Sequence, residues 1–179
     1  MPLSLTNPRI RYAWPQVVLH WLSAAIILWV MCSGAYLALF EVSPSRKAAM
    51  ADFNISISLL LIPVFIVRCV VRMAIPGPSA HAGRRYEQLL AQVVHLALYG
   101  AIALVLVTGV LIIDEDLSAF GVLHVPALFS EHAWRAAWVQ VHFFSLGLLF
   151  ALIILHIGAV IKHQLAGRSV LWRMWFSGH

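Results

Sequence analysis

Four long apolar stretches dominate this sequence, at about residues 15–40, 47–73, 84–113 and 132–165. Each is longer than the roughly 20 residues that an α-helix needs to cross the hydrocarbon core of a bilayer. Apolar residues make up 62% of the chain and charged residues 11%, whereas soluble domains average about 45–50% and about 25%. The sequence therefore predicts an all-α membrane protein, a four-transmembrane-helix bundle in one domain of residues 1–179, and excludes a water-soluble globule.

The basic residues gather at one end of the predicted bundle. Nine of the twelve lie in the N-terminal segment, around the connection after the second span or near the C-terminus, while six of the seven acidic residues lie at the other end. By the positive-inside rule, both termini are expected to be cytoplasmic. Because these basic residues flank apolar runs and form no solvated face, nucleic acid is not an expected partner.

The connection between the third and fourth spans, residues 114–131, is acidic and contains the run SAFGVLHVPALF. This run is expected to form a short helix that lies in the membrane interface. Pro63 is expected to kink the second span, because proline removes a backbone donor from the helix. Cys32 and Cys69 are expected to pack in the membrane without forming a disulfide.

Three histidines lie deep in predicted helices, where polar side chains are costly and often functional. His20 is near the cytoplasmic end of the first span, and His142 and His156 are fourteen residues apart in the fourth. That spacing separates them by about 21 Å along the helix and keeps them within about 40° of one face.

One imidazole near each membrane surface suits stacked haems b, with His20 and His156 as a bis-histidine pair. Zinc is a weaker alternative, because His142 and His156 are too far apart to share one ion. For any one of these histidines, hydrogen-bonded packing between helices is the other interpretation.

Several motifs resemble the bacterial cytochrome b561 family: LHWL at His20, VVHLALYG at His95, the run from Val141 to His156, and IKHQLAGRSVLWRM close behind it. The resemblance covers nearly the whole chain. It implies a multi-pass protein of the bacterial inner membrane that carries two haems b, one per leaflet, and exchanges electrons with ubiquinone. It also implies that His20 and His156 ligate the cytoplasmic-side haem and that His142 is one ligand of the periplasmic-side haem.

The sequence departs from that family at Asn54, fourteen residues before Arg68, where the family has its fourth haem ligand. Asparagine is not a usual haem ligand. The outer haem is therefore expected to be absent, bound through His142 alone, or completed by another side chain. The side chains considered for that role are Met50, His124 and His132. A further interpretation of Asn54 is an interhelical hydrogen bond.

Three more side chains near the cytoplasmic side have expected roles. His95 is interpreted as a quinone contact, a partner of a haem ligand or an alternative ligand, with polar packing as an equal alternative. Arg68 and Lys162 are expected to pair with haem propionates, the alternative being charges that snorkel to the interface.

The chain has no glycine-rich phosphate loop, no CxxC pair and no Ser/His/Asp order on strands, so redox chemistry is expected to belong to a bound cofactor. We expect a haem b electron-transfer protein that works with the ubiquinone pool, in contact with membrane lipid and with a redox partner. The alternative is a haem-bearing anchor or electron-conducting subunit of a dehydrogenase.

One branch of the resembling family oxidises superoxide, which would make this protein an oxidoreductase. The six external acidic residues would repel an anion overall. A local patch of Arg46, Lys47 and Arg135 would still attract it.

Overall fold

Four long α-helices make up most of the computed structural model, which describes residues 11–78, 85–113, 116–127, 132–168 and 170–175. They are α1 (Trp14–Leu39), α2 (Pro44–Ala74), α3 (Arg85–Leu111) and α4 (His132–Leu165). All four are long and apolar enough to cross a membrane. The predicted four-span bundle is confirmed, and the helices begin and end within three residues of the predicted positions.

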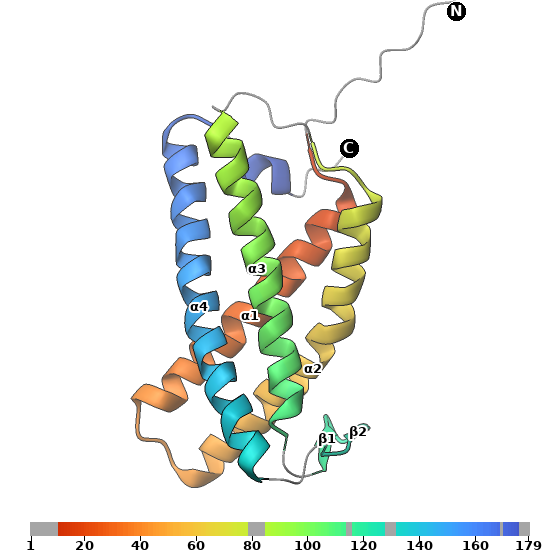
Figure 1. Cartoon of the computed structure of the whole chain (residues 1–179), viewed down its shortest axis with the longest axis vertical. Helices are drawn as coiled ribbons and strands as arrows, with labels where there is room; N and C mark the ends of the chain where they lie inside the picture. The colour runs from red at the N-terminus through yellow and green to blue at the C-terminus, as the bar shows by residue number, and fades with distance from the viewer. Residues whose placement is uncertain (1–10, 79–84, 114–115, 128–131, 169, 176–179) are drawn as a thin grey trace, which may run out of the picture.

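The helices associate as two antiparallel pairs. α1 packs mainly on α2, α3 packs mainly on α4, and a smaller contact joins α2 to α3. The described ends of the chain lie together at one end of the bundle, which we call the terminal end (Figure 1). The α1–α2 connection and a small β-hairpin lie at the opposite end, the hairpin end.

Hydroxyl side chains buried inside this apolar bundle bond to their own helices. Ser23, Thr108 and Ser145 have no exposed surface, and each donates to the carbonyl oxygen four residues earlier, at 2.6–2.7 Å. A polar group without a partner is costly in hydrocarbon. These bonds let the helices carry a hydroxyl inside the bundle at little cost.

The prediction of a short helix between the third and fourth spans is wrong for the described residues. The segment forms an antiparallel hairpin of β1 (Leu117–Ala119) and β2 (Leu123–Val125); residues 128–131 lie outside the described part. Positive φ angles of 51° at Phe120 and 70° at Gly121 reverse the chain there, and a helix cannot contain them. The Phe120 backbone N–H donates to Ser56 Oγ at 3.3 Å, which holds the hairpin against α2.

A short C-terminal segment crosses the terminal end of the bundle. We call residues 170–175, which include the 3₁₀ helix η1 (Leu171–Met174), the C-terminal strap. It is tied to the start of α1 by two hydrogen bonds, from Trp21 Nε1 to the Met174 carbonyl (2.7 Å) and from the Tyr12 amide to the Arg173 carbonyl (3.2 Å).

Candidate functional site

One aliphatic side chain from each helix meets its neighbours in the middle of the bundle. The four are Ile27, Leu61, Ile102 and Leu149, which belong to one buried cluster and are 2–8% exposed. We call them the apolar layer. Because they lie in one cluster, they mark the face that each helix turns toward the interior.

Residues seven positions along a helix lie within about 20° of the same face and about 10.5 Å away along its axis. Moving seven residues from the apolar layer toward the terminal end therefore gives a second set of positions on the same helix faces, which we call the basic layer: His20, Arg68, His95 and His156. Moving seven residues toward the hairpin end gives a third set, the glycine layer: Gly34, Asn54, Gly109 and His142.

Side-chain contacts support this assignment of the basic layer. Arg68 Nη2 lies 3.0 Å from Nδ1 of His20, which joins α2 to α1. The rings of His95 and His156 meet edge to face, with centroids 5.4 Å apart, which joins α3 to α4. Arg68 also donates from Nε to the Tyr99 hydroxyl at 3.2 Å. The structure thus brings three of the predicted histidines and the predicted arginine to one level of the bundle.

The Arg68 contact fixes the proton on His20. A guanidinium group only donates hydrogen bonds, so Nδ1 of His20 accepts and the ring proton lies on Nε2. For Nε2 to bind a metal, that proton has to leave and Arg68 has to turn to another acceptor. A carboxylate is the acceptor that a guanidinium binds best.

Thr108 holds His142 in the opposite way. Thr108 Oγ1 lies 2.6 Å from the Leu104 carbonyl, to which it gives its only proton. The same oxygen lies 2.9 Å from Nδ1 of His142, so the imidazole donates from Nδ1 and its lone pair lies on Nε2. A methyl group added at Gly109 would lie 3.4 Å from Cε1 of His142, so this glycine lets the ring lie close against α3.

In the glycine layer, His142 belongs to the α3–α4 pair of helices, and the amide of Asn54 belongs to the α1–α2 pair. Ser33 Oγ lies 2.9 Å from Oδ1 of Asn54, and this hydrogen-bonding contact joins α1 to α2 as the packing interpretation predicts. An open groove of about 270 Å³ runs beside Asn54 and is almost entirely apolar. Its lining residues are Trp29, Ala49, Met50, Phe53 and Asn54.

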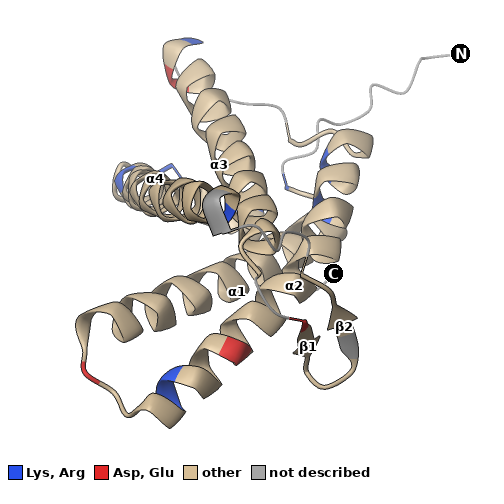
Figure 2. Cartoon of the chain, turned by 60° about the horizontal axis from the view of Figure 1, so that its bottom comes forward, with Lys and Arg blue, Asp and Glu red and all other residues tan. Residues whose placement is uncertain are grey.

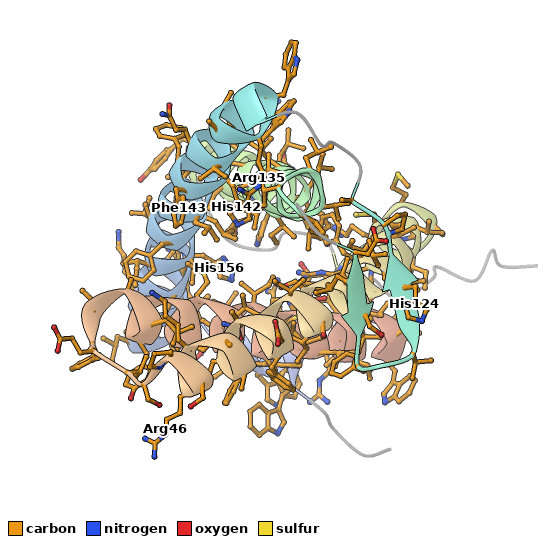
Figure 3. All side chains as sticks on the ribbon, turned by 90° about the horizontal axis from the view of Figure 1, so that it is seen from below. Arg46, His124, Arg135, His142, Phe143 and His156 are labelled. Carbon is orange, nitrogen blue, oxygen red and sulfur yellow. The ribbon has the colours of Figure 1, made fainter. Side chains whose placement is uncertain are left out.

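Other predicted site residues lie away from the layers. His124 is exposed on β2, and Figure 3 shows it on the hairpin, well apart from His142. His132 is the first residue of α4, and its side chain lies outside the described part. Lys162 is exposed in the last turn of α4. Met50 is half-buried in the groove.

The external basic patch expected from Arg46, Lys47 and Arg135 is not formed as one surface. Figure 3 shows Arg46 and Arg135 on opposite sides of the hairpin end. Arg135 Nε donates to the Ile112 carbonyl at 3.1 Å, so this side chain is turned toward the end of α3. The expected patch is therefore wrong.

A comparison with known protein families decides the class of protein. The model for prokaryotic cytochrome b561 matches residues 11–177, nearly the whole chain. The chain belongs to the prokaryotic cytochrome b561 family. One curated relative, cytochrome b561 homolog 2 of Escherichia coli (strain K12), is 26% identical over 167 residues, which cover 90% of this chain and 89% of the relative.

Membership of the cytochrome b561 family makes this four-helix bundle a multi-pass protein of the bacterial inner membrane. Its function is electron transfer on haem b. The histidines of the two layers suit haem b. Porphyrin supplies four of the iron ligands, and imidazoles would supply the remaining ones. Within the described ranges, no three His, Cys, Asp or Glu side chains are grouped to hold a metal ion by themselves.

The fit to haem differs between the two layers. In the glycine layer His142 already has its lone pair on Nε2, and a Cβ added at Gly34 would meet no atom within 4 Å. In the basic layer His20 fits once Arg68 turns to a propionate. Sequence reasoning missed Thr108, for which the signal is a lone hydroxyl beside Gly109 in an apolar helix.

Proposed function

We propose that His20 and His156 hold one haem b in the basic layer and that His142 is an axial ligand of a second haem in the glycine layer. The observation that supports this proposal is the seven-residue register, which puts His20, Arg68, His95 and His156 at one level of the bundle. In this reading, single electrons pass between the two layers and the ubiquinone pool. Bound haem supplies a one-electron couple between ferric and ferrous iron.

The other polar groups of the basic layer have supporting roles. Arg68 pairs with a haem propionate and releases Nδ1 of His20, which then carries the proton and leaves Nε2 to the iron. Tyr99 holds the guanidinium from the α3 side. His95, in edge-to-face contact with His156, keeps that ring oriented. Lys162 is the second propionate partner, since its exposed ammonium group lies near the terminal end of α4.

Both termini are cytoplasmic in this proposal, because the terminal end carries most of the basic residues. The basic layer then lies in the inner leaflet, and ubiquinone reaches it from the surrounding lipid. Superoxide oxidation at the opposite end is less well supported, since Arg46 and Arg135 lie apart and acidic residues predominate there. A membrane subunit that conducts electrons for a dehydrogenase is the alternative.

A reduced-minus-oxidised spectrum of the purified protein, with the haem-to-protein ratio, tests the proposal. We expect a b-type spectrum in the unaltered protein and the loss of one haem per chain in His20→Ala and in His156→Ala. His124→Ala is the matched control, because its imidazole is exposed on the hairpin. Protein that binds no haem, or His156→Ala with an unchanged spectrum, refutes the assignment. Quinone reduction by the isolated protein separates this function from that of a dehydrogenase subunit, which needs its partner.

A further inference from the structure

His142 and Asn54 occupy the same level of the bundle on different helix pairs. Asn54 is ten residues after the first residue of α2, and His142 is ten residues after the first residue of α4. Both helices begin at the hairpin end (Figure 1). Each of the two residues is also seven positions from a member of the apolar layer, Leu61 or Leu149.

The two side chains have opposite capacities toward iron. His142 has its Nε2 lone pair available, because Thr108 fixes the ring proton on Nδ1. Asn54 has a neutral amide, which is not a usual haem ligand, and Ser33 holds one end of it. A haem held by His142 therefore has an imidazole on one face and no ligand from Asn54 on the other.

The other histidines at the hairpin end are not positioned to be a second ligand of an iron that is bound to His142. Two axial ligands of one iron approach it from opposite faces along one line. His132 is on the same helix as His142 and about 15 Å away along its axis. His124 is exposed on the hairpin, apart from His142 (Figure 3).

The surface around Asn54 is apolar, which indicates the chemistry of a ligand that can approach this side of the bundle. The groove beside Asn54 is open, holds about 270 Å³ and exposes almost no polar surface. Trp29 and Phe53 line it, and both are more than 40% exposed on helices that cross the membrane. A charged ligand loses its hydration beside such a surface at a large cost in free energy, whereas a small neutral molecule does so at little cost.

We propose that the haem held by His142 is five-coordinate and that its sixth position, beside Asn54, binds a small neutral diatomic molecule such as carbon monoxide, nitric oxide or oxygen. This inference rests on the proposed function, since it needs a haem on His142. It goes further by assigning the side of the bundle that carries Asn54 to the sixth position of the iron. Met50 lines the groove one turn nearer the hairpin end, and its thioether is the competing sixth ligand.

The test is the carbon monoxide difference spectrum of the reduced, haem-loaded full-length protein in detergent, measured together with the haem-to-protein ratio. We expect two haems per chain, of which one binds carbon monoxide. Asn54→His places an imidazole opposite His142, so carbon monoxide binding should fall at least tenfold with the haem content unchanged. Asn54→Ala is the matched control and should keep the carbon monoxide band, because alanine adds no ligand.

Several outcomes overturn the inference. Two haems per chain without a carbon monoxide band show that both are six-coordinate, and a band that appears only in Met50→Ala identifies Met50 as the sixth ligand. One haem per chain without a band shows that the glycine layer holds none, while the basic-layer haem of the proposed function stands. Absence of any haem refutes the proposed function itself. A band that persists unchanged in Asn54→His places the open site elsewhere.

Discussion

Nδ1 of His142 donates a hydrogen bond to Thr108 Oγ1 across the α3–α4 interface, at 2.9 Å. The direction of this bond follows from the single proton of Thr108, which goes to the Leu104 carbonyl at 2.6 Å. A ring held in this way keeps one orientation and one tautomer. The hydroxyl of Thr108 therefore leaves the lone pair of His142 on Nε2, which is the atom that the proposed haem ligation needs.

Replacing Thr108 by valine should weaken haem binding in the glycine layer. Valine has the same shape but cannot accept from Nδ1, so His142 loses the partner that fixes its tautomer. Loss of such a partner typically lowers metal affinity about 10–100-fold. Haem titration into the haem-free protein measures the effect, and Thr108→Ser should restore affinity because it keeps the hydroxyl. Equal affinity in the valine and serine variants would show that the hydrogen bond does not matter.

Arg68 should set the potential of the haem in the basic layer. Its guanidinium group lies 3.0 Å from His20, and a positive charge near a haem favours the reduced iron. Arg68→Gln should therefore lower the midpoint potential by about 60 mV, which is a tenfold change for a one-electron couple. A spectroelectrochemical titration measures it, with Arg68→Lys as the charge-preserving control. The role assigned to Arg68 is wrong if glutamine and lysine leave the same potential.

Leu149 should be important for the stability of the bundle. It is 2% exposed in the apolar layer, and truncation to alanine leaves a cavity that costs about 2–5 kcal/mol. Thermal unfolding in detergent should show a lower midpoint for Leu149→Ala. Its neighbour Leu148 is 43% exposed, so Leu148→Ala should change stability by no more than about 0.5 kcal/mol. Similar losses in both variants would argue against a packed central layer.

The C-terminal strap should loosen when its bond to α1 is removed. Trp21→Phe keeps an aromatic ring but loses the hydrogen bond to the Met174 carbonyl. A bond of this kind contributes about 0.5–1.5 kcal/mol, so limited trypsin cleavage at Arg173 should become about two- to tenfold faster. Trp134→Phe, at an exposed position on α4, is the control. Unchanged cleavage would mean that other contacts hold the strap.

The four spans were predictable because their signal is simple. A run of more than 20 apolar residues has few alternatives to a membrane helix, and the ends at Pro44 and Ala74, for example, lie within three residues of the predicted span. The hairpin was not predictable in the same way. The run around Phe120 and Gly121 is apolar enough for an interfacial helix, and only their positive φ angles show that the chain turns back there.

The candidate site was partly visible in the sequence. The spacing of His142 and His156 predicted two levels in α4, and His20 was placed at the level of His156. The same seven-residue register exists in α1, α2 and α3, but it becomes visible only when the buried cluster shows that Ile27, Leu61 and Ile102 point inward. The prediction of a patch containing Arg46 and Arg135 was wrong because a count of charges shows at which end of the bundle a residue lies. It does not show on which side of that end the residue lies.

The apolar layer separates two sets of polar side chains with four aliphatic ones. Electrons can tunnel past aliphatic carbon, whereas a proton needs a relay of oxygen or nitrogen atoms to move along. Ile27, Leu61, Ile102 and Leu149 offer no such relay. In the proposed arrangement, an electron that passes between the two layers has no proton beside it at this depth, so its passage changes the voltage across the bilayer with a sign set by its direction.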